Sequence, residues 1–290
     1  MEHFKISAEH LPLLTELLDL SNEKGPFGRG YPQGDLAGLT HEFKEIGQDL
    51  MENFYVVGDG LVGFFDAPWG HYVIGPLFLP KHHQAETIAA ALKSLSAFPF
   101  LKGRKLKLDI REENEAMLAA AKRAGLKNSY RGVAMEYALS KYEPAPDHEG
   151  ICEVAASDQP LLEQVAQIFT DDLELGDSSE WTVSNLEEML EDGTKIAVLT
   201  VDGQVAGAVI YSWDEELSEG EAEYVCVKKA CQGRGYGKAL IHYMVGRFAD
   251  EPEGMLYLDT ARTNVKAQNL YLRYGFEITY YRHLYELEIS

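Results

Sequence analysis

Apolar residues in the second half of the chain recur with two different periods. Four stretches place them three or four residues apart, as on one face of a helix: Leu161, Leu162, Val165 and Phe169; Leu186, Met189 and Leu190; Leu240, Tyr243, Met244 and Phe248; and Ala267, Leu270, Tyr271 and Tyr274. Strand-like runs occur as a hairpin around Asp202-Gly203, at 221–227, at 255–261 and in a run ending at Ile289. Gly275 is expected to end the last helix in a left-handed conformation. The order helix, helix, hairpin, strand, helix, strand, helix, strand predicts an α/β fold, a mixed sheet with helices on both faces.

The first half of the chain repeats this pattern, which indicates an internal duplication. Placing residues 106–109 over residues 256–259 sets an offset of 150 residues. Without a gap, the same offset pairs Asn114 with Asn264, Gly125 with Gly275, Tyr130 with Tyr280 and Glu136 with Glu286. Further upstream, NFYVVGDGLVGFF and KIAVLTVDGQVAGAVIYS each hold an Asp-Gly pair between alternating apolar runs. We therefore predict two copies of one fold, at residues 1–140 and 151–290. Residues 141–150 form the predicted linker, because Pro144, Pro146 and Gly150 interrupt any regular element there.

Composition narrows the class of protein. A chain of 290 residues fits two domains, and 46% hydrophobic with 25% charged residues is typical of a soluble globular protein. The net charge of −21 would repel a phosphate backbone, so nucleic acid is not an expected partner. Residues 1–145 carry 16 basic and 19 acidic side chains, which is −3, and residues 146–290 carry 10 and 28, which is −18.

The cysteines and the first residues indicate a cellular location. Cys152, Cys226 and Cys231 have no metal-ligand spacing and are expected to be reduced thiols, as in an intracellular protein. The start of the chain lacks the features of a signal peptide, and no apolar run of ~20 residues occurs, so no membrane partner is expected. We predict a cytoplasmic protein, either a monomer or a homodimer, with no metal site.

One glycine-rich turn stands out because it follows a predicted strand and precedes a predicted helix. In Gln232-Gly233-Arg234-Gly235-Tyr236-Gly237 the glycines let main-chain N–H groups approach an anion, and the helix N-terminus adds to the attraction. Arg234 and Lys238 bring positive charge into a strongly acidic half. The turn is neither a dinucleotide fingerprint nor a nucleotide-binding P-loop. It is therefore a candidate phosphate site, and the alternative is a turn that only connects strand and helix.

Two motifs together resemble the GNAT acetyltransferase superfamily. The turn matches the signature [RQ]-x-x-G-x-[GA], and the pattern N-x-x-A-x-x-L-Y-x-x-x-G-F is matched by Asn264, Ala267, Leu270, Tyr271, Gly275 and Phe276. The resemblance covers residues 151–290 and implies two tandem GNAT-like folds, each a mixed, mostly antiparallel sheet with helices on both faces. It implies acetyl-CoA as the acetyl donor, with its pyrophosphate at the turn and its pantetheine between two splayed parallel strands. The residues expected to contact the cofactor are Val225, Cys226, Val227, Gln232, Gly233, Arg234, Gly235, Tyr236, Gly237, Lys238, Asn264 and Tyr271.

The first copy departs from these motifs at the positions that would bind the cofactor. The 150-residue offset places His82, Ala85 and Thr87 opposite Gln232, Gly235 and Gly237, and Ala121 opposite Tyr271. A Cβ in the turn blocks close approach of a phosphate, and alanine has no proton to give. We predict that residues 1–140 are a degenerate copy and that chemistry is confined to residues 151–290.

Three chain positions are candidates for catalysis. An amine with a pKa of ~10.4 must lose a proton before it attacks, and Glu223 or Glu221, on one side of the strand entering the turn, are candidate bases. The alternative is that they are solvated carboxylates at a strand end. The resemblance implies that Tyr271 protonates the leaving thiolate and that an N–H near Val227 stabilises the oxyanion. Without the resemblance, Tyr271 would be assigned to a helix's apolar face. Asn264 is expected to bond the pantetheine or cap its helix.

Acidic residues around the first two predicted helices suggest the acceptor. Nine fall within 22 residues: Asp171, Asp172, Glu174, Asp177, Glu180, Glu187, Glu188, Glu191 and Asp192. They would attract a cationic amine, such as a polyamine, an aminoglycoside, a lysine side chain or a peptide N-terminus, although a solvated face is an equally ordinary explanation. The resulting hypothesis is an N-acetyltransferase acting on a small-molecule or peptide amine by direct attack in a ternary complex. The competing hypothesis is a non-catalytic acyl-CoA sensor or interaction protein.

Overall fold

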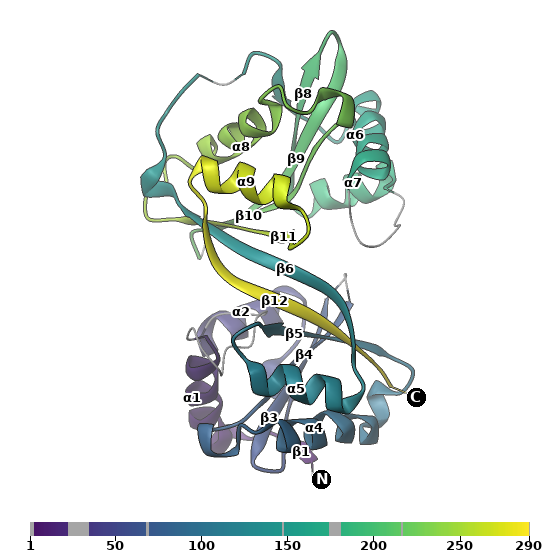
Figure 1. The fold of residues 1–290 in the computed structure, drawn as a ribbon, viewed down its shortest axis with the longest axis vertical. Coiled ribbons are helices and arrows are strands. Elements are labelled where there is room, and N and C mark those ends of the chain that lie inside the picture. The colour runs from purple at the N-terminus through teal and green to yellow at the C-terminus, as the bar shows by residue number, and fades with distance from the viewer. Residues whose placement is uncertain are drawn as a thin grey trace. The chain divides into compact units, whose positions relative to one another are not determined.

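A computed structural model describes residues 3–22, 35–67, 70–146, 148–173, 181–215 and 217–289. The chain divides into two compact units. Unit 1 comprises Met1–Gly132 and Tyr280–Ser290, and unit 2 comprises Val133–Thr279. Each unit has its own helices and its own set of strands (Figure 1).

Unit 1 is a mixed sheet with helices on both faces. Its strands lie in the order β1-β2-β3-β4-β5-β12-β6, where β4 and β5 are parallel and the other pairs with a known register are antiparallel. Its elements are β1 (His3–Lys5), α1 (Leu11–Asn22), α2 (Leu36–Glu45), α3 (Leu50–Asn53), β2 (Phe54–Val57), β3 (Gly60–Ala67), β4 (Gly70–Leu77), α4 (Ala85–Ser94), β5 (Lys105–Arg111), α5 (Glu115–Ala124), β6 (Lys127–Ala138) and β12 (Glu277–Glu288).

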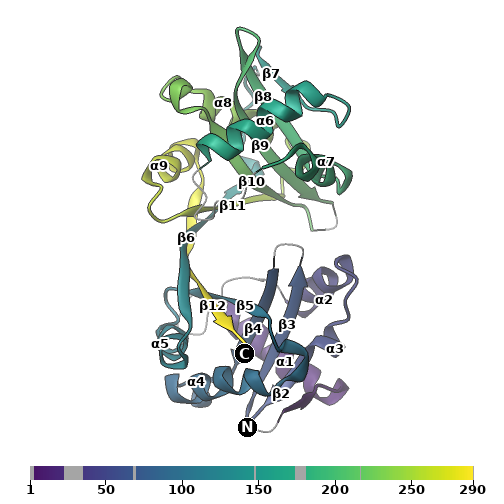
Figure 2. The ribbon, with the colours of Figure 1, turned by 90° about the vertical axis from the view of Figure 1, so that its right-hand side faces the viewer.

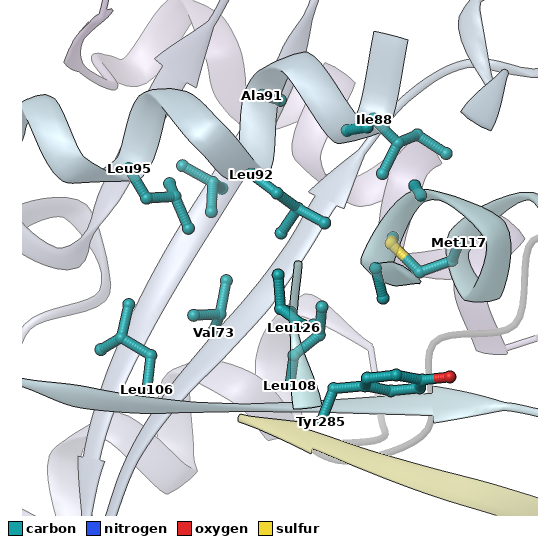
Figure 3. Close-up of a cluster of buried hydrophobic side chains, with 14 of the residues drawn as sticks. Val73, Ile88, Ala91, Leu92, Leu95, Leu106, Leu108, Met117, Leu126 and Tyr285 are labelled. Carbon is teal, nitrogen blue, oxygen red and sulfur yellow. The ribbon is translucent and has the colours of Figure 1, made fainter. Parts of the chain in front are cut away.

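Two apolar layers stabilise unit 1. One layer joins the sheet to α4 and α5, and the other joins it to α1, α2 and α3. In the first layer Ile88 and Leu92 of α4 pack on Met117 of α5 and on Leu108 of β5, all at most 3% exposed (Figure 3). Side chains therefore fill the space between α4 and α5 completely.

Unit 2 has the order of elements that the sequence predicts for the second copy, with a short extra strand, β7. Its strands lie in the order β7-β8-β9-β10-β11-β6, and β10 and β11 are parallel. Helices α6 and α7 lie on one face of this sheet, and α8 lies on the other (Figure 2). The elements are β7 (Ile151–Glu153), α6 (Gln159–Asp172), α7 (Val183–Glu191), β8 (Lys195–Val201), β9 (Gln204–Asp214), β10 (Glu219–Val227), α8 (Tyr236–Gly246), β11 (Met255–Ala261) and α9 (Val265–Tyr274).

Local sequence explains most of these boundaries. Asp202 and Gly203 both have positive φ, at 51° and 75°, which matches the twist of the β8–β9 hairpin. The Asn264 side chain accepts a hydrogen bond from Ala267 N–H and caps α9, and Gly275, with φ of 121°, ends it. One detail differs from the prediction. Phe248 lies beyond the end of α8, where its ring stacks on Trp213 with centroids 4.6 Å apart.

The last strand corrects the predicted domain boundaries. Residues 151–290 do not form one continuous module, because β12 pairs antiparallel with β5 of unit 1, from Arg282 opposite Arg111 to Glu288 opposite Lys105. Strand β6, at the end of the first repeat, extends in turn into unit 2. An ion pair anchors β12 in unit 1: the partly buried Arg282 has its Nε 2.9 Å from Oδ2 of the buried Asp109. The repeat pattern did not predict this exchange of β6 and β12 between the units. Both strands have the same alternation of apolar and polar residues, and that alternation does not specify which neighbouring strand each one pairs with.

Candidate functional site

Strands β10 and β11 are paired at one end and separate toward the other. They pair at Glu219–Met255, Gly220–Leu256 and Glu221–Tyr257, and the structure gives no further pair among the residues it describes. Strand β10 stays paired with β9 as far as Val227 opposite Gly207. The edge of β10 that faces β11 is therefore open beyond Glu221, so its main-chain groups can bond a ligand. Unit 1 repeats this splay, since the pairs between β4 and β5 among the described residues join 71–73 to 106–108.

One main-chain donor points into the opening between β10 and β11. Lys228 N–H donates to Ala206 O on β9 at 2.9 Å, and successive N–H groups of a strand point to opposite sides. The N–H of Val227 therefore points away from β9, toward the opening. The Val227 carbonyl accepts a hydrogen bond from Gln232 Nε2 at 3.1 Å, so Gln232 also fixes the start of the turn.

The glycine-rich turn has the conformation that an anion site requires. Gly233 and Gly235 have φ of 77° and 87°, and a Cβ at either would meet no atom within 4 Å. Across the described ranges, the main-chain N–H groups from Gly233 to Lys238 have no hydrogen-bond partner. They surround the N-terminus of α8, whose dipole also favours negative charge. Residues 233–238 therefore present a row of main-chain donors of the kind that can bind a phosphate.

The corresponding turn of unit 1 satisfies its own donors. His83 N–H donates to Pro80 O at 3.3 Å, and Gln84 N–H donates to His82 O at 2.9 Å. At the start of α4, the Glu86 carboxylate accepts a hydrogen bond from its own main-chain N–H and pairs with Arg123, and both interactions lower the pKa of Glu86. In unit 1 the Glu86 carboxylate therefore lies at the start of α4. At the corresponding start of α8 in unit 2, the main-chain donors are left free for an external anion.

The helices beside the two turns also differ between the units. In unit 1, α4 and α5 pack along each other. Asn114, which caps α5, and Ala121, within α5, are at most 1% exposed. In unit 2, α8 and α9 touch only locally, and Asn264 is half-buried. The close approach is at Gly237, where an added Cβ would lie 3.0 Å from Leu270 Cδ2. Unit 2 thus keeps open the space that unit 1 fills with side chains.

Positive charge near the turn is accessible. Arg234 and Lys238 are exposed, and neither has an ion-pair partner in the part of the chain that the structure describes. Tyr236 is half-buried, with its ring 5.8 Å edge-on from that of His148. The two cations are therefore free to bind an anion held by the main-chain donors.

Glu223 occupies a bulge in β10. Ala222 lies opposite Tyr211 and Tyr224 opposite Ile210, so Glu223 is an extra residue between them. Burial raises the pKa of Glu223, and hydrogen bonds from the side chains of Ser212 and Thr194 oppose that rise. This environment makes Glu223 a stronger base than an exposed carboxylate, while the two hydroxyls hold it in place.

Glu221 is in a different environment from Glu223. Its side chain is exposed, and it lies opposite Ser212 on β9 and Tyr257 on β11. The bulge lies between the two glutamates, so the strict alternation assumed from the sequence does not hold there. Burial raises the pKa of Glu223, and its assignment as the base stays a prediction.

Tyr271 is buried on α9 at 7% exposure, and burial raises its pKa. Its ring lies 5.8 Å from that of Phe276. The phenol is therefore protonated at neutral pH, as a proton donor must be, but its catalytic role stays a prediction.

The side chain of Cys226 points away from the opening. It lies in the core formed with α6, where Sγ is 3.8 Å from Ile168 O, and burial raises the pKa of this thiol to about 12. Val227 points to the other face of the sheet, since its Cγ2 lies 3.8 Å from the position of a Cβ on Gly237. Cys226 can therefore contribute to the opening only through its main-chain groups.

The sheet face below α6 and α7 holds polar groups that the sequence did not single out. Glu219 accepts a hydrogen bond from the Tyr257 hydroxyl at 3.2 Å, and burial raises the pKa of Glu219. An aromatic group also lies near Glu223: the rings of Trp181 and Tyr224 are 4.8 Å apart, and Phe169 is 5.0 Å from Trp181. These residues are brought together by the order of the strands, which the sequence pattern does not encode.

The predicted acidic run lies partly on the helices. Asp171 and Asp172 end α6, and Asp172 lies 3.9 Å from Lys229 Nζ. Glu187, Glu188 and Glu191 belong to α7, which Asp192 caps. Glu174, Asp177 and Glu180 lie outside the described residues.

No cluster of three or more histidine, cysteine or acidic side chains suited to a metal ion occurs in the described ranges. Across the same residues, none of the helices combines the length and the apolar character needed to span a bilayer.

Comparison of the sequence with known protein families gives a match for the residues that form this site. Residues 162–276 match the acetyltransferase (GNAT) family, a range that includes the opening, the turn and both motifs. No curated protein matches the chain by sequence.

Solved structures share the fold over the whole chain. A GCN5-related N-acetyltransferase from Sphaerobacter thermophilus has a TM-score of 0.71 at 18% identity, over 100% of this chain and 96% of its own. A tandem GNAT protein from the clavulanic acid biosynthesis pathway has a TM-score of 0.61 at 16% identity, over 100% and 98%. A GNAT acetyltransferase from Colwellia psychrerythraea has 0.56 at 12%, over 100% of both chains. At such identities the likeness shows the fold, and it confirms the prediction of two GNAT-like modules. Residues 162–276 therefore match the acetyltransferase (GNAT) family, and the fold of GNAT proteins extends over the whole chain.

Proposed function

We propose that the second copy transfers the acetyl group of acetyl-CoA to a primary amine by direct attack in a ternary complex. The observation that carries the proposal is the row of unpartnered N–H groups from Gly233 to Lys238, beside an opening lined by β10. The opening ends near Glu223, so a donor bound there and an acceptor near the carboxylate would meet on β10. The first copy would not bind the cofactor, because its turn and its helix interface are filled.

The residues fit coenzyme A in two places. The turn offers main-chain donors and the cations Arg234 and Lys238 for a pyrophosphate, and the free edge of β10 offers N–H and C=O groups for the amides of pantetheine. Bound acetyl-CoA supplies an activated thioester. The N–H of Val227, pointing into the opening, is placed to stabilise the charge that develops on the carbonyl oxygen.

Two side chains would transfer the protons of the reaction, one from the acceptor amine and one to the leaving sulfur. Glu223, directly or through a water, accepts a proton from the acceptor ammonium, so that the amine nitrogen can form the new C–N bond. Tyr271, kept protonated by burial, donates its proton to the departing sulfur as the C–S bond breaks. Asn264 caps α9 through Ala267 N–H at 3.1 Å and so fixes the helix that carries Tyr271.

The acceptor would be a cation. Glu219, Glu221 and Glu223 lie along the same stretch of β10, and the acidic ends of α6 and α7 lie on the same face of the sheet. This concentration of negative charge attracts an ammonium ion and repels an anionic acceptor. A cytoplasmic location, consistent with three free cysteines, is part of the same proposal.

The test measures thiol release from acetyl-CoA with a panel of polyamines, aminoglycosides, lysine peptides and N-terminal peptides. We expect release with at least one cationic amine and a strongly reduced rate of release in Glu223→Gln. Coenzyme A binding without turnover across the panel would instead favour an acyl-CoA sensor. Absence of coenzyme A binding would refute both functions.

A further inference from the structure

The side chain of Tyr271 is held by packing. Its hydroxyl makes no hydrogen bond within the described residues, and desolvation is the cause that raises its pKa. The ring is 7% exposed, and its centroid lies 5.8 Å from that of Phe276. The carbonyl of Tyr271 accepts hydrogen bonds from Gly275 N–H at 3.1 Å and from Phe276 N–H at 3.0 Å. The orientation of the phenol therefore depends on how Gly275 and Phe276 are themselves held.

Tyr137 packs against both of these residues. It lies on β6, belongs to unit 2 and is 3% exposed. Its ring centroid is 5.2 Å from that of Phe276, which is 2% exposed. A Cβ added to Gly275 would lie 3.2 Å from Cε2 of Tyr137, so the ring of Tyr137 covers the main chain at Gly275. The ring of Tyr274 completes the group, 5.5 Å from Tyr137 and 6.1 Å from Phe276. Tyr137 thus closes the end of the helix that carries Tyr271.

Unit 1 lacks the phenol and also lacks these rings. The 150-residue offset pairs four aliphatic residues with the four aromatic ones: Ala121 with Tyr271, Ala124 with Tyr274, Leu126 with Phe276 and Leu287 with Tyr137. All four aliphatic residues belong to the apolar layer of Figure 3 or pack against it. A Cβ added to Gly125 would meet no atom within 4 Å, in contrast to Gly275. The aromatic packing therefore accompanies the phenol, and the fold itself does not require it.

We propose that Tyr137 is a positioning residue for Tyr271, which it holds in one orientation by packing on Phe276 and Gly275. The inference rests on the proposed function, in which Tyr271 protonates the leaving sulfur. Because Tyr137 ends the first repeat, a residue of the first copy would complete the site of the second. A proton donor displaced by ~1 Å can lose as much as ~10²-fold in rate, so packing of this kind has a measurable effect.

The first test needs no acceptor. Tyrosine labelled with ¹³C at Cζ is incorporated into the full chain, and the resonance of Tyr271 is identified by its loss in Tyr271→Phe. Tyr137→Leu supplies the side chain that unit 1 has at this position, and it should broaden or shift that resonance because the ring loses its fixed orientation. Tyr137→Phe keeps the packing ring and should leave the resonance unchanged. An unchanged Tyr271 resonance in Tyr137→Leu would overturn the inference.

The second test measures the single-turnover rate of acetyl transfer, with the amine of the panel that gives the fastest thiol release. Saturating acetyl-CoA is needed because Tyr137 also lines a pocket of about 650 Å³ that includes Gly235, so its substitution can change coenzyme A affinity. We expect Tyr137→Leu to lower the rate by about tenfold and Tyr137→Phe to keep it within about twofold of the wild type. In the Tyr271→Phe background Tyr137→Leu should lower the rate no further, because no phenol proton remains to be positioned.

Tyr285→Leu is the matched control. Tyr285 is also 3% exposed, and it lies on β12 in the apolar layer of unit 1. Its substitution should lower Tm and leave both the transfer rate and the Tyr271 resonance unchanged. Equal losses of rate in Tyr285→Leu and Tyr137→Leu, or the same loss from Tyr137→Leu with and without the Tyr271 hydroxyl, would overturn the inference while the proposed function stands. If no amine supports release, the proposed function fails, and the carbon spectra still decide whether Tyr137 orders Tyr271.

Discussion

Replacing Gly235 by alanine isolates the role of the glycine-rich turn. Gly235 has φ of 87°, a conformation that costs a residue with a Cβ roughly 1–2 kcal/mol. An added Cβ meets no atom within 4 Å, so no steric clash adds to this cost. Because alanine also restricts the unfolded chain, we expect a net loss of about 1 kcal/mol in unfolding free energy. That loss corresponds to a fall of roughly 2–4 °C in Tm.

The effect on binding should be much larger than the effect on stability. The open space around Gly235 is where a phosphate would approach the N-terminus of α8, and a methyl group there keeps the anion from the main-chain donors. Losing one charge-assisted hydrogen bond is worth ~1.5–3 kcal/mol, so we expect coenzyme A affinity to fall by at least about tenfold. Titration calorimetry measures the affinity, and thermal unfolding measures the stability.

Gly203→Ala is the matched control. Gly203 has φ of 75°, again with no atom within 4 Å of an added Cβ, but it lies in the β8–β9 hairpin. It should lose similar stability and keep full affinity. If Gly235→Ala binds coenzyme A as well as the wild type, or if Gly203→Ala weakens binding equally, the phosphate cradle is wrong.

Three further changes test other parts of the molecule. Glu223→Gln should abolish the acidic limb of the pH–rate profile: burial raises the pKa of Glu223 above 4.5, so wild-type activity rises with pH through that pKa. If Glu223→Gln kept the wild-type pH–rate profile, Glu223 would not be the base. Tyr271→Phe should lower kcat in steady-state assays with little change in coenzyme A affinity, and unchanged kcat would remove the phenol from the mechanism. Asp109→Ala leaves the partly buried Arg282 without that partner and should cost up to about 3 kcal/mol in urea unfolding, the low end for a broken buried pair. Additive costs in a double-mutant cycle with Arg282→Met would show that the two residues are not coupled.

Sequence patterns predicted well those features that depend on neighbours along the chain. Helical spacing located α6 to α9, and Asp202-Gly203 located a hairpin whose two residues have positive φ. The glycine-rich turn was also found, because positive φ at Gly233 and Gly235 is a local requirement for glycine. Its proposed ligand followed from the strand before it and the helix after it.

Features that depend on strand order were outside the reach of these patterns. Nothing in the alternation of residues 277–288 shows that β12 pairs with β5 of unit 1. The hydroxyls of Ser212 and Thr194 reach Glu223 from two other stretches of chain, and a bulge decides where that carboxylate sits. Tyr137 and Lys141 line one pocket together with Gly235, although they are more than 90 residues before it in the chain.

The sequence alone determined the duplication, the order of elements and the position of the glycine-rich turn, since periodicity and backbone conformation are set by residues close together in the chain. Tertiary structure decided which turn stays open: Glu86 and the packed helices α4 and α5 close it in unit 1, while α8 and α9 leave it free in unit 2. It also decided which strand completes unit 1 and which residues surround Glu223. Those outcomes depend on packing between segments that are distant in the sequence. The pattern of apolar and polar residues within one segment does not determine the free energy of that packing.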